Sequence, residues 1–314
     1  MNKKFGTYWQ RYGTLGILFL IIFLLGILSP EYFLTSNNLT QVALQSAITI
    51  LIACGEFFAI LIAGIDLSVG SIIALTGMIT GKLLVAGWPV WIAILLGGVF
   101  AGAVLGAVNG TLVNVTGLHP FIITLGTLSI FRGFTLILSD AKPVFGFPQI
   151  FKDSVSGWLW NIPIPVIIAF VVAAILYFIT TKTILGRNIY ALGGNPQSAW
   201  FSGINVKTHT LIVFIISGIA AGIAGVVMTA RLAAAEPLAG VGFETYAIAS
   251  AIIGGTSFFG GKGTIFGVVM GGLIIGVINN GLNILNVPTF YQQIVMGFLI
   301  ISAVSLDRFV GIKK

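Results

Sequence analysis

Few side chains that could carry out acid–base, nucleophilic or metal chemistry lie inside the apolar stretches of this 314-residue chain. Glu56 and Arg132 lie well inside such stretches, whereas His119 and His209 fall at stretch ends. Ionisable groups are costly in lipid and usually face a bundle interior, so Glu56 and Arg132 either pair with each other or line a pathway. The sequence shows no series of Asp, Glu and His for proton coupling, no nucleophile–base pair and no cluster of metal ligands. This pattern argues against an ion-coupled carrier and an intramembrane protease, and it predicts no cofactor.

One segment resembles a phosphate-binding loop but lacks that loop's essential residues. It runs from Thr256 to Gly263 and contains the sequence Gly-Gly-Lys-Gly. Thr256 replaces the first glycine of the motif, and Gly263 stands where a Ser or Thr would bind magnesium. The segment also lies between two apolar stretches rather than between a strand and a helix. We therefore expect no nucleotide binding by this chain.

A polar, glycine-containing segment interrupts the apolar pattern at residues 64–71. It reads Gly-Ile-Asp-Leu-Ser-Val-Gly-Ser and includes Asp66, Ser68 and Ser71. These side chains could cap the helix that follows, because Asp and Ser satisfy the free N–H groups of a first turn. Alternatively, the broken backbone lines a polar cavity, since irregular backbone at membrane depth is tolerated where it is shielded from lipid.

The composition requires lipid as the main solvent. Of the residues, 57% are hydrophobic and 7% are charged, whereas a soluble protein carries about a quarter charged residues. The basic residues are scattered in ones and twos between apolar stretches, so the net charge of +7 reflects membrane topology rather than nucleic-acid binding. The lone cysteine, Cys54, excludes an intramolecular disulfide. We expect an all-α membrane protein with one multi-pass domain over residues 1–314.

Ten apolar stretches are candidates for membrane-spanning helices. With a cytoplasmic N-terminus, ten Lys and Arg residues face the cytoplasm, as the positive-inside rule requires. Four face outward: Lys82, Lys142, Lys152 and Arg231. An even number of spans also places the C-terminus in the cytoplasm. The first stretch resembles a signal peptide but lacks a small-x-small cleavage site, so we expect an uncleaved span. The predicted spans are 14–29, 41–62, 68–86, 89–116, 120–138, 163–181, 210–230, 245–259, 264–283 and 290–306.

An internal repeat is visible at an offset of 170 residues. Glycines in the fourth and ninth stretches correspond, and Asn109 corresponds to Asn279. Because 170 residues contain five spans, the two copies would cross the membrane in opposite directions. That arrangement is typical of transporters whose substrate route lies at the repeat interface. The alternative is that two glycine-rich packing faces agree by chance.

The internal segment 182–209 is basic and is predicted to contain a short helix. Asn195 is a good N-cap and Pro196 suits the first helical position, so we expect a helix over 196–202 that ends at Gly203. So short a helix is marginal in water, and it carries Ala199, Trp200 and Phe201. The helix would therefore lie back on the bilayer or insert into a groove of a cytoplasmic partner.

Several motifs together resemble the permease subunits of ribose-type sugar importers of the ATP-binding cassette class. The resemblance runs from about residue 30 to 307, with the motifs in the same order. The motifs are the segments 64–71, 185–195, 202–205, 254–257, 260–263 and 279–283.

The resemblance implies a homodimeric pore subunit in the bacterial inner membrane. It would work with a cytoplasmic ATPase and an external sugar-binding protein, periplasmic or lipid-anchored. Segment 182–209 would be the coupling loop, with ATPase contacts at Gly194, Asn195, Pro196, Ala199, Trp200, Phe201 and Gly203.

We expect translocation of a pentose, ribose in particular, by alternating access, with hydrolysis of ATP in the separate partner. A neutral polyol needs only weak hydrogen bonds from amides and hydroxyls along its route. An ion-coupled secondary sugar carrier and a non-transporting membrane scaffold are the alternatives. The candidates for the substrate route are Ser68, Ser71, Asn109, Thr124, Asn279 and Asn280.

Overall fold

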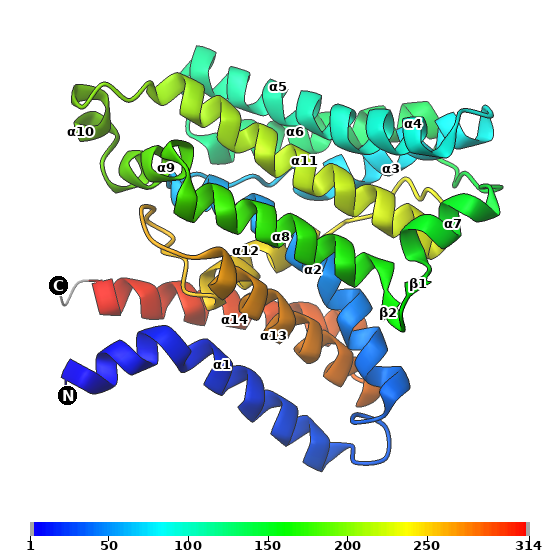
Figure 1. The fold of residues 1–314 in the computed structure, drawn as a ribbon, viewed down its shortest axis with the longest axis horizontal. Coiled ribbons are helices and arrows are strands. Elements are labelled where there is room, and N and C mark those ends of the chain that lie inside the picture. Colours follow the sequence, from blue (N-terminus) through cyan, green and yellow to red (C-terminus); the bar gives the residue numbers. More distant parts are fainter. Residues whose placement is uncertain (1–2, 312–314) are drawn as a thin grey trace.

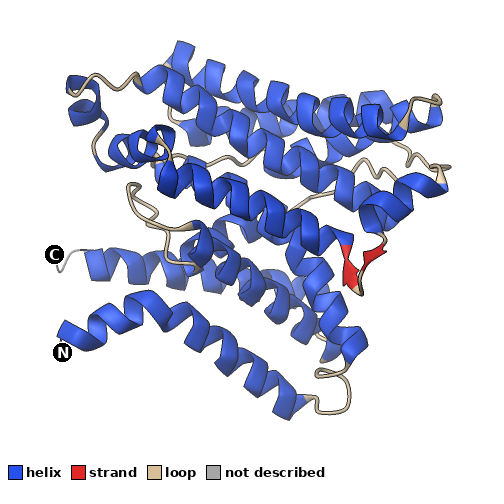
Figure 2. Cartoon of the chain, viewed as in Figure 1, coloured by secondary structure: helices blue, strands red, loops and turns tan. Residues whose placement is uncertain are grey.

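The computed structural model describes residues 3–311, and over that range the chain is a bundle of helices with one two-stranded ribbon (Figures 1 and 2). The expected all-α membrane fold is confirmed. The elements are α1 (Lys3–Leu28), α2 (Ser36–Leu61), α3 (Val69–Val85), α4 (Val90–Ile94), the π-helical segment η1 (Leu95–Phe100), α5 (Ala101–Thr116), α6 (Pro120–Ser139), α7 (Gln149–Ser156), β1 (Trp158–Leu159), β2 (Ile162–Pro163), α8 (Ile164–Lys182), α9 (Ile184–Gly194), α10 (Pro196–Phe201), α11 (Val206–Leu232), α12 (Phe243–Ile253), α13 (Ile265–Ile284) and α14 (Thr289–Gly311).

Each of the ten predicted spans corresponds to an apolar helix. Within the described residues, six helices are long and apolar enough to cross a membrane, and four shorter apolar ones accompany them. The helices α4, η1 and α5 form one continuous span over Val90–Thr116. The short helix α10 lies at one end of the bundle, where α1 also begins and α14 ends (Figure 1). We call this the α10 end.

Two predicted elements differ from the structure. The stretch 245–259 is not a full span, because α12 ends at Ile253 and Gly255 follows with a φ of +89°. Eleven helical residues rise only about 17 Å, roughly half the thickness of a hydrocarbon core. The segment 182–209 also holds a helix that the sequence did not predict, α9, which begins with Thr183 as its N-cap.

The helices form two inverted copies of one unit, as the 170-residue offset predicts. Helix α2 begins at Ser36 and α11 at Val206, while η1 begins at Leu95 and α13 at Ile265. The sequence of elements α2, α3, α4 to α5, α6 thus recurs as α11, α12, α13, α14. Helix α2 runs toward the α10 end and α11 runs away from it (Figure 1).

The glycine faces pack the two copies against each other. A Cβ atom on Gly102 of α5 would lie 3.1 Å from the carbonyl carbon of Gly218 in α11, and one on Gly106 would lie 2.8 Å from that of Phe214. In the other copy, Gly276 of α13 lies against Ser46 of α2. Small residues let helix backbones approach closely in lipid, where hydrophobic driving force between helices is absent.

The long segment between α6 and α8 lies at the end opposite α10 (Figure 1). It contains α7 and the ribbon β1–β2, in which Trp158 pairs with Pro163. A backbone bridge joins Val144 to Ala235, with N–O distances of 3.0 and 2.9 Å. This bridge ties the segment to the loop between α11 and α12.

Candidate functional site

Two helices start in the middle of the bundle and meet there. The loop 62–68 leads into α3, and the loop 233–242 leads into α12. Gly70 and Gly240 are 170 residues apart, and their backbones touch: a Cβ on Gly240 would lie 2.6 Å from the carbonyl oxygen of Gly70. Equivalent residues of the two copies therefore contact each other, which places the pseudo-twofold axis of the repeat at this point. Discontinuous helices at a repeat interface are typical of transporter substrate sites.

Arg132 of α6 holds this meeting point together. Its guanidinium donates hydrogen bonds to the carbonyl oxygens of Pro237 at 2.7 Å, Ala239 at 2.8 Å and Gly70 at 3.2 Å. Arg132 therefore binds backbone from both repeats. It does not pair with Glu56, whose Oε1 accepts a hydrogen bond from the backbone N–H of Asp66 at 3.0 Å.

A closed polar cluster surrounds the carboxylate of Asp66. Ser68 donates its hydroxyl to Asp66 Oδ1 at 2.6 Å, and Ser217 of α11 donates to Oδ2 at 2.8 Å. Asn109 donates to Ser68 Oγ at 2.8 Å and accepts from Thr127 at 2.7 Å. These side chains are almost completely buried. Each polar atom of these five side chains has at least one hydrogen-bond partner in the cluster.

The other residues of the first repeat that we predicted to line the substrate route also donate hydrogen bonds to backbone carbonyl oxygens. Ser71 donates its hydroxyl to the carbonyl oxygen of Ser68 at 2.8 Å. Thr124 of α6 donates to the carbonyl oxygen of Ile65 at 2.9 Å. Ser68 lies at the N-cap position of α3, but its side chain bonds to Asp66 rather than capping the helix. The polar segment thus folds into a network that fixes the broken backbone.

A second polar site, the Asn279 cavity, lies near the end opposite α10. Its volume is about 200 Å³. Asn279 Oδ1 is buried there and has no hydrogen-bond partner. Gln292 donates to Asn283 Oδ1 at 2.8 Å. The neighbouring candidate Asn280 lies outside the cavity and exchanges two amide hydrogen bonds with Asn38, at 3.0 and 2.8 Å. The cavity is lined by Gln45, Ile48, Thr49, Arg231, Phe243, Tyr246, Asn279, Asn283 and Gln292.

The closed cluster and the open cavity occupy corresponding places in the two repeats. Asn109 and Asn279 are related by the 170-residue offset. The first lies among residues of α3, α6 and α11, and the second among residues of the equivalent helices α12, α14 and α2. The same position is therefore filled by partners in one copy and faces a cavity in the other.

Sequence reasoning did not identify most of the side chains around Asn279. Arg231 was assigned only as an outward-facing charge, and Gln45 and Gln292 were not singled out. Each is an isolated polar residue near the end of an apolar stretch, which was the available signal. Their convergence depends on tertiary packing of four different helices.

A third feature is an exposed aromatic surface at α10. Asn195 caps this helix by accepting a hydrogen bond from the Ser198 N–H at 2.9 Å. Ala199 is buried, whereas Trp200 and Phe201 are 62% and 73% exposed, with ring centroids 5.0 Å apart. The helix ends as predicted, with Gly203 at a φ of +82°.

The backbone just before α10 is packed tightly against the ends of other helices. Gly193 lies against the carbonyl oxygen of Leu61, the last residue of α2, and a Cβ on it would be 2.7 Å from Gly261 N. Gly261 N–H donates to the same Leu61 oxygen at 2.8 Å. Tyr190 of α9 donates its hydroxyl to Gly263 O at 2.8 Å, and burial raises the pKa of this phenol. We call this contact of α9, α2 and the loop 254–264 the glycine junction.

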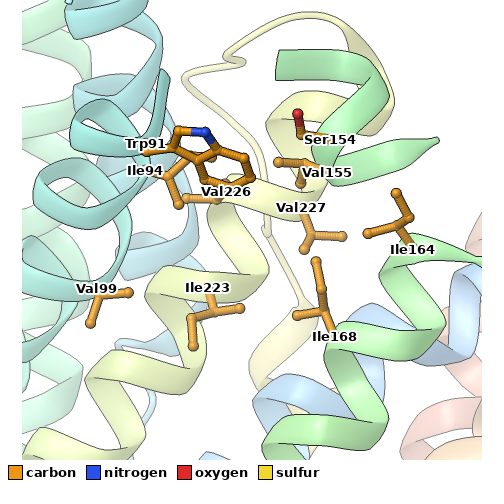
Figure 3. Close-up of a pocket in the computed structure, with 10 residues that line it drawn as sticks. All are labelled: Trp91, Ile94, Val99, Ser154, Val155, Ile164, Ile168, Ile223, Val226 and Val227. Carbon is orange, nitrogen blue, oxygen red and sulfur yellow. The ribbon is translucent and has the colours of Figure 1, made fainter. Parts of the chain in front are cut away.

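A larger cavity of about 270 Å³ has different chemistry (Figure 3). Trp91, Ile94 and Ser154 lie at its upper part, and Ile223, Val227 and Ile168 project into it from α11 and α8 (Figure 3). Its lining is apolar except for the hydroxyl of Ser154 and the indole N–H of Trp91, so it suits hydrocarbon rather than a polar ligand.

These features define a class of protein: a multi-pass permease built from an inverted repeat, with a short exposed helix beyond its spans. A family model described as "Branched-chain amino acid transport system / permease component" matches residues 38–304. The chain belongs to this family.

Curated relatives match almost the whole chain. The "D-allose transport system permease protein AlsC" of Escherichia coli (strain K12) is 65% identical, covering 98% of this chain and 94% of the relative. The "Ribose import permease protein RbsC" of Haemophilus influenzae is 39% identical over 100% of this chain and 98% of the relative. That of Bacillus subtilis is 41% identical over 95% and 93%. No solved structure matches. These relatives confirm the resemblance to ribose-type permeases, a class of inner-membrane translocation subunits rather than enzymes.

Proposed function

We propose that the chain is the membrane-spanning permease of an ATP-binding cassette importer that carries an aldose into the cell. The relatives are permeases of sugar import systems by name. The observation that carries the proposal is α10, a short capped helix outside the spans with two exposed aromatic side chains. Exposed aromatic pairs are typical anchors for a partner protein. The partner is a cytoplasmic ATPase, and an external sugar-binding protein delivers the substrate.

D-allose is the first candidate substrate and D-ribose the second. The sequence alone suggested a pentose. The 65% identical relative is named for D-allose, a hexose, and the relatives named for ribose are about 40% identical. Both sugars are neutral polyols, which agrees with the small number of charges in the spans.

The α10 end faces the cytoplasm in this proposal, and two copies pair. Basic residues gather at that end in the predicted topology, as the positive-inside rule requires. Three glycines on α6 and α14 face open space: a Cβ atom added to Gly126, Gly133 or Gly297 would have no neighbour within 4 Å. These open glycine positions would allow close approach of a second copy in the membrane.

Replacing Trp200 and Phe201 together by Ser tests the docking surface. Both side chains are exposed, so the change should leave the permease folded and inserted. We expect loss of co-purification with the ATPase and at least a tenfold fall in sugar uptake, because about 1.4 kcal/mol of lost binding already weakens a complex tenfold. Tyr177→Ser, on the exposed face of α8, is the control. Unchanged ATPase association and uptake would show that α10 is not the docking surface.

A further inference from the structure

We infer that the apolar cavity in Figure 3 binds one acyl chain of a membrane phospholipid. The cavity measures about 270 Å³ and lies at the end of the bundle opposite α10, among α4, η1, α7, α8 and α11. Protein interiors are close-packed and contain few voids larger than a water molecule, so a space of this size needs an occupant. The inference rests on the membrane location of the chain and is independent of which sugar the permease carries.

The lining residues are spaced by helical turns along three helices that span the membrane. They include Trp91, Ile94 and Val99 of the span Val90–Thr116, Ile164 and Ile168 of α8, and Ile223 and Val227 of α11. Residues four apart on one helix are separated by a rise of about 6 Å. The cavity therefore extends along the helix axes, which is also the direction of acyl chains in a bilayer.

Polar atoms border only one end of the cavity. The Trp91 indole N–H and the Ser154 hydroxyl lie at its upper part in Figure 3, and the other lining side chains are aliphatic. The Ser154 hydroxyl already donates a hydrogen bond to the carbonyl oxygen of Ile150. Because water in a cavity needs two to four polar partners, this lining does not suit water. Tryptophan side chains favour the headgroup level, so the polar end matches a lipid headgroup and the aliphatic part matches its chain.

The cavity borders the surface of the spans that faces lipid. Val99 and Ile168 in its lining are only half-buried, and Phe100 and Phe170 close to them in the chain are exposed. A chain from the surrounding bilayer can therefore enter from the side. A helix of a partner protein cannot, because a helix with its side chains is about 10–12 Å wide. In the proposed orientation the polar end of the cavity lies toward the outer leaflet.

Photo-labelling in proteoliposomes tests the lipid site. The permease–ATPase complex is reconstituted with increasing fractions of a phospholipid that carries a diazirine on one acyl chain, and the labelled segments are mapped by mass spectrometry. Ile168→Trp fills the cavity from α8. Ile175→Trp makes the same change at an exposed position of the same helix and is the matched control. Assembly with the ATPase, measured by gel filtration, shows that each variant is folded.

We expect labelling of residues 164–168 and 223–227 to saturate as the fraction of labelled lipid rises, because a single site can be filled. Labelling around Ile175 should instead rise in proportion to that fraction. Ile168→Trp should reduce the labelling of residues 223–227 by about tenfold, which corresponds to about 1.4 kcal/mol of binding, and Ile175→Trp should leave it unchanged.

Two results would overturn the lipid site. The first is labelling of the cavity segments that rises only in proportion to the lipid fraction, or that Ile168→Trp leaves unchanged. The second is cross-linking between two Ser154→Cys copies together with no lipid label in the cavity, which would assign the cavity to a second copy of this chain.

Discussion

At the scale of single residues, polar side chains in this bundle differ chiefly in whether they have partners. Asp66 accepts hydrogen bonds from four donors, and Asn109 both donates and accepts. Asn279, its equivalent in the second repeat, has an unpartnered oxygen beside a cavity. Residues of the first kind hold the broken backbone in place. Asn279 borders the cavity, but its side-chain oxygen has almost no accessible surface.

Arg132 should be a major contributor to the stability of the fold. Replacing it by Met leaves the carbonyl oxygens of Pro237, Ala239 and Gly70 without their donor. Hydrogen bonds from a charged donor to buried carbonyls are worth more than neutral ones, so we expect a loss of about 2 to 4 kcal/mol in unfolding free energy. This loss in unfolding free energy is measured by SDS titration in mixed micelles.

Lys142→Met is the control for that measurement, because Lys142 is an exposed cation in a loop. It should change stability by less than about 0.5 kcal/mol. Equal stabilities of the two variants would show that the Arg132 bridge between repeats contributes nothing.

The sequence identified the polar residues but not their partners. The segment 64–71 stood out because Asp66 and two serines interrupt an apolar pattern, and capping and cavity lining were both left open. The structure shows a third arrangement, in which Ser217, 151 residues away, completes the binding of the Asp66 carboxylate. Contacts at that separation follow from helix packing, which local residue patterns do not encode.

At the scale of elements, the glycine junction connects α10 to α3 and α12. Gly193 lies three residues before Pro196, the first residue of α10, and it touches the end of α2, which leads directly into the loop 62–68 and α3. It also contacts Gly261, in the loop between α12 and α13. A displacement of α10 by the ATPase would therefore be transmitted through backbone to both α3 and α12.

Gly193→Ala should separate ATP hydrolysis from transport. A Cβ at this position would press on the Leu61 carbonyl and lie 2.7 Å from Gly261 N, so the junction must open. We expect hydrolysis to continue while uptake falls about tenfold, a change of about 1.4 kcal/mol in coupling. Hydrolysis and uptake are measured together in proteoliposomes.

Two further variants serve as a control and as an independent test of the glycine junction. Ala191→Ser adds an atom to the exposed face of the same helix and should leave both rates unchanged. Tyr190→Phe removes the hydroxyl contact with Gly263 O without adding bulk, and it should reduce uptake in the same direction. If both Gly193→Ala and Tyr190→Phe kept the wild-type ratio of sugar uptake to ATP hydrolysis, the glycine junction would not connect α10 to the spans.

Element positions were largely predictable because apolar stretches in a membrane protein mark its helices directly. The capped helix at 196–201 was also predictable, since Asn195, Pro196 and Gly203 carry local signals. It was not predictable that α12 is only about half the length of a membrane span. Hydropathy continues beyond Ile253, and only the positive φ of Gly255 shows where the helix stops.

At the scale of the whole molecule, the inverted repeat is the main organising feature of the fold. The two copies cross at Gly70 and Gly240, are bridged by Arg132, and differ in whether their equivalent asparagine faces a cavity. In the proposed importer, the energy for transport comes from ATP hydrolysis in a separate partner protein.

The measurement that tests this account most directly is sugar accumulation in proteoliposomes containing the permease, its ATPase and the sugar-binding protein, without ion gradients. We predict that D-allose accumulates against its concentration gradient when ATP is hydrolysed, and that accumulation persists when ionophores collapse the membrane potential. Accumulation that requires an ion gradient and ignores ATP would contradict the account and favour an ion-coupled carrier. Absence of any sugar movement would favour a scaffold.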